Sequence, residues 1–500
     1  MKPYDVIIIG AGHNGLTASA YLARRGKRVL ILERRPTLGG TLATQSFGDG
    51  AESDAVWPGG HLRPDVVRDL NLPAFGYPAR RTPPPLISLL SDSDSLVLDS
   101  DPAVAAGSIR RFSEKDARRW PEFVAFMHKS AGLLERAYAT LMPRLPRNFD
   151  GGEGYGLLKF AVGLRLAGRT EMIRFSRSLL MTAQELVDDW FESEPLKAAV
   201  ASLGIHSVTL GPMGAGTGFA LVHNWPNRGG LSHSNVGRAG AITNALAGSF
   251  KAAGGEIRTD AEVERLLIDL YACTGVALSS GEEIRAGTLL SAADPKRTLL
   301  SLVGPMHLPP EFVWKTQSIK MRGAVAKVHL LTDGRHGLPE GTLIVAPSIR
   351  YLERAYDAAK YGGVSEAPYL EVTTAGSVVS IHFQYAAYDL KGSNWTEGRR
   401  AVEDLAIETL ARYSPNLRAS IKERISLMPA DLEATYGLTE GDLNHGQLML
   451  DQCFFMRPIP GWSNHRTPID GLYLCGSGVH GGGGVSGASG RNAARAVLKR

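Results

Sequence analysis

The feature that most constrains this chain is a glycine-rich turn near its start. Residues 6–9 are an uninterrupted apolar run, which predicts a strand buried on both faces, and Gly10, Gly12 and Gly15 follow it. Gly10 permits the turn, Gly12 leaves room for a pyrophosphate, and Gly15 lets the next helix pack closely. The backbone N–H groups at the start of that helix provide an anion site. We therefore expect the chain to begin with a Rossmann-like domain that binds a dinucleotide.

The residues after the turn complete the same unit. Gly26 closes the predicted helix, residues 28–32 predict a second strand, and Glu33 stands at its end. A carboxylate at this point accepts hydrogen bonds from ribose hydroxyls and disfavours a 2′-phosphate by charge repulsion. A glycine turn without a ligand would not require strand, helix, second strand and acid in this order, so we interpret the segment as a cofactor site.

A second glycine-rich signature lies near the end of the chain. Residues 472–474 predict a strand, Gly476 and Ser477 follow, and residues 481–484 are four consecutive glycines. We expect this run to leave backbone N–H groups free, and the helix that begins near residue 487 to direct its positive end at the cofactor. Each signature alone is a modest indication. Together they predict that both ends of the chain bind one long cofactor, FAD.

Size and composition narrow the class of protein. A chain of 500 residues exceeds what one hydrophobic core usually organises, so we expect two closely joined domains. The net charge is +5 without a dense run of Lys and Arg, which argues against nucleic-acid binding. The three cysteines form no CxxC pair, which argues against a local redox disulfide, and no Cys/His cluster predicts a metal.

The order of the predicted elements indicates an α/β protein in which a Rossmann-like FAD-binding domain is interwoven with a discontinuous α+β substrate domain. We assign residues 1–65, 235–300 and 455–500 to the FAD-binding domain, and residues 66–234 and 301–454 to the substrate or cap domain. Because the chain alternates between the two domains, we expect the reactive part of the cofactor at the domain interface, where pockets usually form.

Local patterns predict several elements of these domains. Ser113 has the position of a helix N-cap, with Asp116 three residues later. A hairpin begins at Val263, and residues 378–385 predict a strand with one apolar face and one open face. The predicted helices cover residues 112–126, 157–180, 183–200 and 241–253.

The chain carries no sequence signal for membrane insertion. The first predicted strand follows so closely on the first residues that we expect no signal or transit peptide, and no run of about 20 apolar residues predicts a membrane span. We therefore expect a cytoplasmic protein. Residues 155–181 mix apolar residues with five basic ones, which leaves two interpretations: a peripheral membrane contact, or a helical cap over the pocket, which we prefer.

Shorter motifs accompany the two glycine signatures: residues 112–117 (FSEKDA), 190–193 (WFES), 429–433 (PADLE), 441–446 (GDLNHG), 457–458 (RP) and 466–468 (RTP). With these motifs, nearly the whole chain resembles the FAD-dependent phytoene desaturase-like oxidoreductases, within the amine-oxidase-like flavoproteins. Among them it is most similar to the subgroup of pyridine nucleotide-disulphide oxidoreductase domain 2 proteins. The resemblance implies FAD, a two-domain fold and redox chemistry on a mostly apolar organic substrate.

Several positions differ from the pattern of this family. Thr41 replaces an arginine that the amine-oxidase branch carries after its paired glycines, and Ser477 stands where many flavoproteins have an aspartate. Gly481 stands where proline is usual. The residues that we expect to bind FAD are Gly10, Gly12, Gly15, Glu33, Arg34, Gly39, Gly40, Thr41, Val263, Gly476, Ser477, Gly483, Gly484 and Val485.

Desaturation removes a hydride from one carbon and a proton from its neighbour, so a base is expected. His480 and His445 are the candidates, because both lie in segments that should converge on the cofactor and histidine titrates near neutral pH. We favour a dehydrogenase or desaturase of a largely apolar substrate, such as a carotenoid or other isoprenoid, with oxygen or a quinone as electron acceptor. Two alternatives remain open: an amine or amino-acid oxidase, and a non-catalytic protein that keeps the fold for protein binding.

Overall fold

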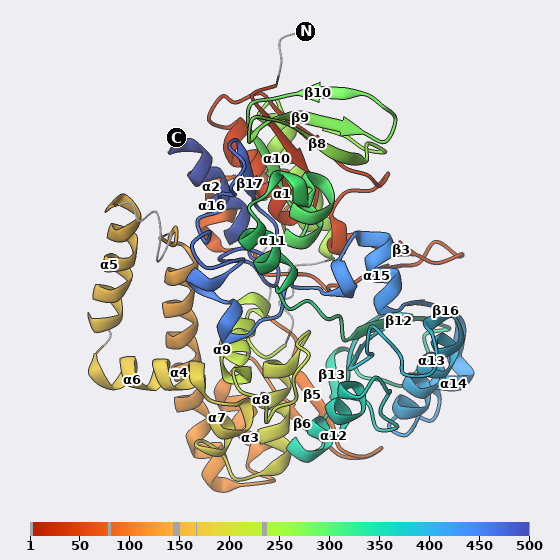
Figure 1. Ribbon diagram of the computed structural model, residues 1–500. Helices are drawn as coiled ribbons and strands as arrows, with labels where there is room; N and C mark the ends of the chain where they lie inside the picture. Colours follow the sequence, from red (N-terminus) through yellow and green to blue (C-terminus); the bar gives the residue numbers. More distant parts are fainter. Residues whose placement is uncertain (1–3, 79–81, 144–150, 167, 233–237, 500) are drawn as a thin grey trace.

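The computed structural model describes residues 4–78, 82–143, 151–166, 168–232 and 238–499. Two large sheets organise the chain: a five-stranded parallel sheet in the upper part of Figure 1, and a seven-stranded sheet in the lower part. Segments from the start, the middle and the end of the sequence meet in the parallel sheet. No helix of the described part of the chain is long and apolar enough to cross a bilayer.

The parallel sheet has the strand order β17-β11-β1-β2-β7. Ile8 of β1 lies opposite Ile31 of β2 on one side and opposite Leu290 of β11 on the other. All residues of β1 and β2 are buried, which explains why both are uninterrupted apolar runs. The Rossmann-like α/β prediction is confirmed. The strands are β1 (Val6–Ile9), β2 (Val29–Leu32), β7 (Glu256–Arg258), β11 (Leu289–Ser291) and β17 (Leu472–Leu474).

Three helices cover one face of this sheet: α1 (His13–Ala23), α10 (Ala239–Ala252) and α16 (Ala488–Leu498). α1 packs against both of the others. A Cβ on Gly490 would lie 2.2 Å from the carbonyl oxygen of Asn14, so only glycine permits α16 to approach α1 this closely. The last helix of the chain is therefore held directly against the first.

The opposite face of the parallel sheet packs against a small antiparallel sheet and short helices. The predicted hairpin is present, because β8 pairs antiparallel with β9, and β10 adds a third strand. These elements are β8 (Val263–Asp269), β9 (Ala272–Leu278), β10 (Glu283–Arg285), η3 (Arg297–Val303), η4 (Pro305–His307) and α11 (Pro310–Gln317).

The seven-stranded sheet has the order β16-β12-β15-β14-β13-β5-β6, and only its β13–β5 pair is parallel among the described residues. One face packs against α13 in an apolar core. All seven strands fall within residues 66–234 and 301–454, the segments that we assign to the substrate domain. They are β5 (Leu86–Leu89), β6 (Ser95–Leu98), β12 (Val325–Thr332), β13 (Gly341–Val345), β14 (Leu370–Ala375), β15 (Val378–Gln384) and β16 (Ile421–Leu427).

The predicted open face of residues 378–385 is wrong. The side chains of His382 and Gln384 are buried, as are Lys327 and Glu371 on neighbouring strands. The polar residues alternate with apolar ones as on a solvent-exposed sheet, but other parts of the chain cover them. The polar face of this sheet is therefore an internal surface.

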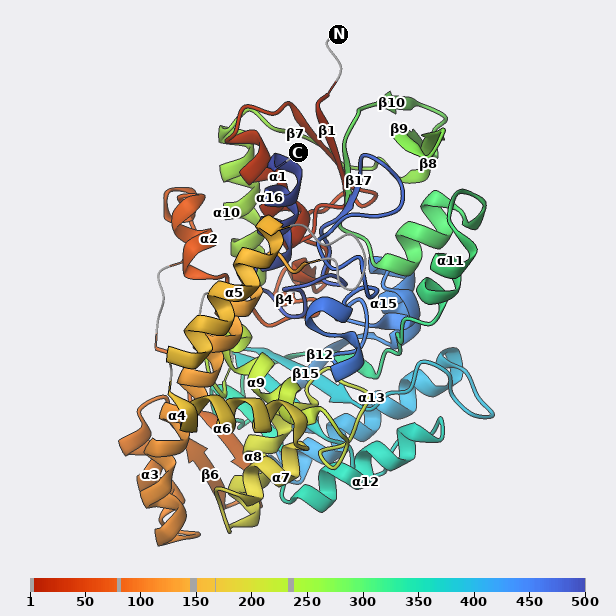
Figure 2. The same ribbon diagram turned by 60° about the vertical axis from the view of Figure 1, so that its left-hand side comes forward.

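Helices α3 to α9 form a helical region in which α3 packs on β6 and α5 lies against α4 and α6 (Figure 2). Ser113 caps α4 as expected, since its hydroxyl accepts a hydrogen bond from the backbone of Asp116 at 3.1 Å. The two long helices predicted after it are each divided: Gly168, at φ +97°, separates α5 from α6, and Pro195 lies in the first turn of α8. The bounds are α3 (Pro102–Ile109), α4 (Glu114–Tyr138), α5 (Gly151–Leu166), α6 (Arg169–Leu180), α7 (Ala183–Asp188), α8 (Glu194–Ile205) and α9 (Thr217–Arg228).

The remaining elements connect the two parts or cover the edges of the sheets. A two-stranded ribbon, β3 (Thr44–Ser46) and β4 (Glu52–Asp54), crosses from the parallel sheet to β15 of the larger one. The helices are α2 (Pro64–Asp69), α12 (Ile349–Lys360), α13 (Trp395–Ala411), α14 (Leu417–Ser420) and α15 (Pro429–Tyr436), with the short turns η1 (Gly40–Leu42), η2 (Leu72–Phe75), η5 (Thr439–Gly441), η6 (Leu450–Gln452) and η7 (Phe454–Met456).

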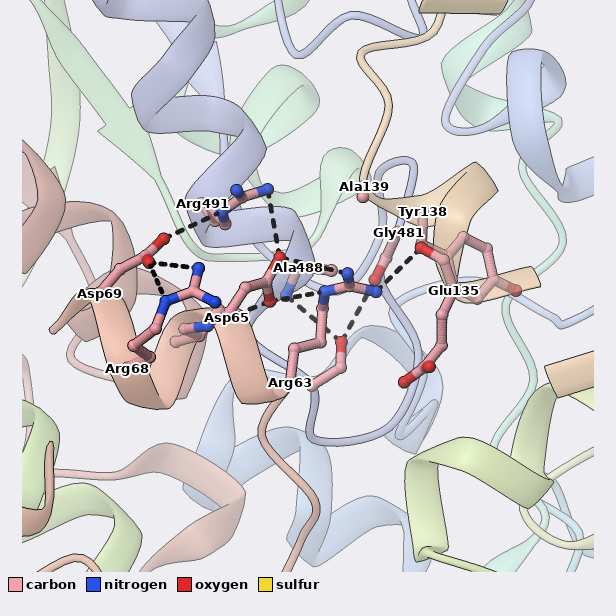
Figure 3. A network of polar contacts seen from close by, with 12 residues as sticks. Arg63, Asp65, Arg68, Asp69, Glu135, Tyr138, Ala139, Gly481, Ala488 and Arg491 are labelled. Carbon is pink, nitrogen blue, oxygen red and sulfur yellow. Dashed lines mark hydrogen bonds and ion pairs between the residues drawn. The ribbon is translucent and has the colours of Figure 1, made fainter. Parts of the chain in front are cut away.

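A network of charged side chains joins α2, α4 and α16 (Figure 3). Arg63 donates hydrogen bonds to Asp65 at 3.0 Å and to the carbonyl oxygen of Glu135 at 2.9 Å. Arg491 of α16 lies 3.5 Å from Asp65 and 3.8 Å from Asp69. Only 12% of the Arg63 side chain and 19% of the Asp65 side chain are exposed, so solvent screens this pair weakly.

We expect Arg63→Ala to lower the free energy of unfolding by about 1.5–3 kcal/mol, because it removes hydrogen bonds to a charged group. Arg68→Ala is the matched control, since that side chain is 75% exposed and solvent screens its pair with Asp69, so the loss should be clearly smaller. Denaturant unfolding measures both losses. Equal losses in the two variants would contradict this assignment.

Candidate cofactor site

A cavity of about 140 Å³ lies at the carboxyl ends of four strands of the parallel sheet. Its wall includes the residues that follow β1, β2, β11 and β17, among them Gly10, Glu33, Ala292 and Gly476. Open α/β sheets bind ligands outside the carboxyl ends of their strands, because the loops there diverge and leave a crevice. The cavity therefore occupies the place that the fold favours for a dinucleotide.

Most of the residues predicted to bind the cofactor lie in this wall, and three do not. Gly15 supports packing instead: a Cβ there would lie 2.2 Å from the carbonyl oxygen of Gly10. A Cβ on Gly483 would meet His223, and Val485 packs over Gly60. The predicted residues that line the cavity are Gly10, Gly12, Glu33, Arg34, Gly39, Gly40, Thr41, Val263, Gly476, Ser477 and Gly484.

The start of α16 is not part of the cavity wall, and the prediction that this helix directs its positive end at the cofactor stays a prediction. Gly487, which caps this helix, packs against Thr17, Leu62 and Val66. The chain turns away from the cavity after Gly484, and the close packing of α16 on α1 fixes that course.

Gly12 provides the clearest test of fit for a cofactor. It lines the cavity, and a Cβ built on it would have no protein atom within 4 Å. Packing against the protein therefore does not require glycine at this position, whereas a ligand that approaches the backbone would. The geometry fits a pyrophosphate that lies against the turn between β1 and α1.

Glu33 is fixed at the end of β2 by two backbone hydrogen bonds. Its Oε2 accepts from the N–H of Ala11 at 2.8 Å, and its Oε1 accepts from the N–H of Arg35 at 3.0 Å. A carboxylate has acceptor sites beyond these two, and Glu33 lines the cavity. The side chain is therefore held where ribose hydroxyls of a bound dinucleotide can donate to it.

His445 lies in the cavity wall, and its Nδ1 is buried without a hydrogen-bond partner in the described part of the protein. Arg457 holds the loop that carries it: the guanidinium donates to the carbonyl oxygens of Asn444 at 2.6 Å and Gly446 at 3.2 Å, and to that of Ser477 at 3.0 Å. The buried arginine thus joins the His445 loop to the C-terminal glycine signature.

Burial lowers the pKa of His445, and the positive charge of Arg457 acts in the same direction, while Asp294 opposes both. The neutral imidazole is therefore favoured at pH 7. A neutral histidine with an unpartnered ring nitrogen is able to accept a proton from a bound molecule.

His480, the other candidate base, does not lie in the cavity wall. It is fully buried, its Nε2 lies 3.0 Å from the carbonyl oxygen of Ala137 on α4, and its ring packs edge-on against Tyr138. Gly481, at φ +80°, is one of the residues at which the chain turns between His480 and Gly484. The structure therefore separates His480 from the cavity, although only three residues lie between it and a residue of the wall.

Comparisons with known proteins agree with this geometry. The model of the family described as "FAD dependent oxidoreductase" matches residues 5–424, most of the chain. The protein belongs to this family of FAD-dependent oxidoreductases. FAD is accordingly its cofactor, and the residues of the cavity wall are those that would hold it.

Two relatives and one solved structure illustrate the extent of the similarity. Pyridine nucleotide-disulfide oxidoreductase domain-containing protein 2 of Rattus norvegicus is 33% identical, over 100% of this chain and 94% of the relative. A limonene dehydrogenase subunit of Castellaniella defragrans is 26% identical, over 100% of this chain and 95% of the relative. Cyclohexylamine oxidase from Brevibacterium oxydans shares the fold, with a TM-score of 0.57, 16% identity and 100% coverage of both chains.

The wall of this oxidoreductase also contains residues that sequence reasoning missed. His13 and Asn14 occupy the variable positions of the first glycine motif, and Asn14 donates to the hydroxyl of Ser477 at 3.2 Å, which links the two signatures. Burial lowers the pKa of His13 to about 4, and nearby His445 adds to the shift. Tyr436 lines the wall with Arg35 4.7 Å above its ring, but no local pattern marks it in the sequence.

We expect Glu33→Ala to weaken FAD binding by about 1–3 kcal/mol, because hydrogen bonds to a charged group are lost. The fluorescence of FAD released on dilution measures the change. Glu264→Ala, an exposed glutamate on β8 outside the cavity wall, is the control and should retain FAD like the wild type. Unchanged retention in Glu33→Ala would count against the ribose assignment.

Proposed function

We propose that this oxidoreductase is a dehydrogenase or desaturase that removes a hydride and a proton from a largely apolar, isoprenoid-like organic substrate. FAD, held by the residues of the cavity wall, would supply the hydride acceptor, and oxygen or a quinone would take up the two electrons. The observation that carries the proposal is the position of His445, which lines the cavity and has a ring nitrogen, Nδ1, without a hydrogen-bond partner in the described part of the chain. We assign to this histidine the role of accepting the proton that leaves the substrate.

Similarity over the full length of a second protein supports the substrate class. The relative from Castellaniella defragrans is named as a subunit of limonene dehydrogenase, and limonene is a terpene hydrocarbon without ionisable groups. A hydrocarbon substrate has no heteroatom lone pair to assist its oxidation. A base in the cavity wall would therefore be needed to accept the proton that leaves the substrate.

The alternatives predict different site features. An amine or amino-acid oxidase favours an aromatic cage around the reactive end of the cofactor. The Trp and Tyr side chains of the described cavity wall do not pair with each other, because each packs against a different residue. Tyr436 packs with Arg35 beside the end of β2, and Trp57 packs against His206. A non-catalytic interaction protein would not need the open space at Gly12 or the fixed carboxylate of Glu33.

Anaerobic reduction of the purified, FAD-containing protein tests the proposal. Limonene should bleach the flavin absorbance and yield a product two hydrogens lighter, whereas p-menthane, its saturated analogue, should not bleach it faster than buffer. Bleaching by primary amines instead would support the amine-oxidase alternative. Rapid bleaching by NAD(P)H alone would overturn the proposal, because the protein would then be a reductase. Reoxidation with oxygen or with a soluble quinone identifies the acceptor.

We further propose that this enzyme is cytoplasmic and rests on a membrane through α5. Tyr155, Leu158, Val162 and Leu166 recur every three or four residues, so they form one apolar stripe along the helix, and Leu166 is 81% exposed. Lys159 and Arg165, both exposed, are the basic residues of the same helix. An exposed apolar stripe with flanking cations suits an anionic bilayer surface, from which an apolar substrate enters.

Flotation with vesicles of phosphatidylcholine and phosphatidylglycerol checks the membrane contact. We expect Leu158→Ser/Leu166→Ser to lose vesicle binding while FAD content stays unchanged, because the change removes apolar area on α5 only. Val104→Ser, on an exposed apolar residue of α3, is the control and should float like the wild type. Equal flotation of all three proteins would rule out α5 as the contact.

A further inference from the structure

Two consecutive glycines, Gly483 and Gly484, form a turn at the edge of the cofactor cavity, the C-terminal glycine turn. Their φ angles are +95° and +68°, so both lie in the left-handed region that favours glycine. Gly484 lines the cavity. Glycine loses more conformational freedom on folding than any other residue, and it has no side chain with which to anchor itself. Contacts from outside the turn must therefore hold it in one conformation.

Helix α9 provides such contacts. A Cβ on Gly483 would lie 2.9 Å from Nε2 of His223, and the backbone of Gly483 forms a hydrogen bond with the same ring. A Cβ on Gly484 would lie 3.0 Å from the side chain of Asn227. His223 and Asn227 stand four residues apart in α9, so they share one face of the helix. The C-terminal glycine turn packs directly on that face.

Tyr138, the last residue of α4, fixes the ring of His223. Its hydroxyl lies 2.6 Å from Nδ1 of the ring, and the side-chain nitrogen of Asn227 lies 3.0 Å from Nε2. Tyr138 is 6% exposed and His223 is 1% exposed. Burial, with the positive charge of Arg457, lowers the pKa of His223 to about 3, so the ring is neutral at pH 7. Hydrogen bonds at both nitrogens therefore set its orientation.

The FAD-binding domain in turn holds the end of α4. The last carbonyl groups of a helix have no partner within the helix, and side chains of α16 bind them here. Asn492 donates to the carbonyl oxygen of Tyr138 at 2.7 Å, and Arg495 donates to that of Ala139 at 2.8 Å. Tyr138 is therefore fixed through its own backbone, and its hydroxyl reaches His223 from a rigid position.

We propose that Tyr138 and His223 are positioning residues for the cofactor, because they hold the C-terminal glycine turn in the conformation that binds FAD. Neither residue belongs to the cavity wall that the structure describes, so each acts through the turn. A turn that is already ordered binds its ligand more tightly, because less conformational freedom is lost on binding. The proposal concerns the retention of FAD and does not depend on which substrate is oxidised.

Release of FAD from the FAD-loaded, full-length protein tests the proposal without turnover. Flavin fluorescence after dilution gives the release rate, and the visible absorption bands report the surroundings of the bound flavin. We expect Tyr138→Phe and His223→Leu each to release FAD about ten-fold faster than the wild type and to shift these bands, because the turn loses a constraint. His223→Gln should restore most of the retention, since its amide can both donate and accept hydrogen bonds.

Tyr385→Phe is the matched control. Tyr385 is 1% exposed, and its hydroxyl donates to the carbonyl oxygen of Leu210 at 2.8 Å, away from the described cofactor cavity. The substitution removes the same group from a tyrosine that is equally buried. It should therefore lower the unfolding temperature as Tyr138→Phe does, and leave FAD release and the flavin spectrum unchanged.

The paired variant Tyr138→Phe/His223→Leu should release FAD no faster than His223→Leu alone, because both changes act on one chain of contacts. Three results would overturn the proposal: wild-type release rates in both single variants, equal acceleration in Tyr385→Phe, or additive effects in the pair. Tyr138→Phe removes a single oxygen atom, so it keeps the test readable if His223→Leu does not fold.

Discussion

Gly12→Val should give a folded protein that binds no FAD. A Cβ on Gly12 has no protein atom within 4 Å, so the first carbon of the valine side chain fits the folded chain. It enters the cavity instead and occupies the space in which the pyrophosphate approaches the backbone. The flavin released by acid measures cofactor content, and circular dichroism reports whether the fold is intact.

Two glycine substitutions act as controls for this result. Gly132→Val places the same side chain in open space on α4, outside the cavity wall, and should retain FAD. In Gly15→Val the new Cβ would lie 2.2 Å from the Gly10 carbonyl oxygen, so this variant should lose both fold and cofactor. A Gly12→Val protein with the wild-type FAD content would refute the assignment of the cavity.

His445→Asn should slow anaerobic reduction of the flavin by about 10²-fold or more, because it removes the group that accepts the substrate proton. Asparagine is the suitable replacement, since His445 has φ +56° and asparagine tolerates this left-handed conformation better than alanine does. FAD content should remain that of the wild type. Stopped-flow absorbance with saturating substrate provides the rate.

His480→Asn is the control that distinguishes loss of the base from loss of any buried histidine. His480→Asn removes a buried histidine outside the cavity wall, so it should lower the unfolding temperature and leave the reduction rate within a few-fold of the wild type. A large loss of rate in His480→Asn with no loss in His445→Asn would show that the base is assigned to the wrong histidine.

The pH dependence of the same rate follows from the lowered pKa of His445. Because the folded protein favours the neutral ring, the base form persists at neutral and alkaline pH. The rate should stay constant above about pH 7 and fall only at a pH below about 6.5, the ordinary pKa of histidine, because the pKa of His445 in the folded protein is lower. His445→Asn should remove this fall.

The sequence determined the parts of the protein that depend on neighbouring residues. β1, the glycine turn and α1 form one local unit, and the apolar run of β1 and the carboxylate of Glu33 lie where they were predicted. The hydroxyl of Ser113 caps α4 for the same reason, since the donor is the backbone of Asp116, three residues later. The membership of the FAD-dependent oxidoreductase family was likewise readable, because its motifs span nearly the whole chain.

Other features were set by contacts between segments far apart in the sequence. The polar face of β15 has the alternation of a solvent-exposed strand, and only the cover provided by other elements makes Lys327 and Glu371 internal. His445 and His480 are equivalent by sequence pattern. Arg457 holds the His445 loop to Ser477 at the cavity, whereas packing on α4 removes His480 from it. The physical reason is that a local sequence pattern reflects the backbone conformation and the polarity of each residue. The burial of a residue and its distance from other residues depend on which distant segment of the chain packs against it.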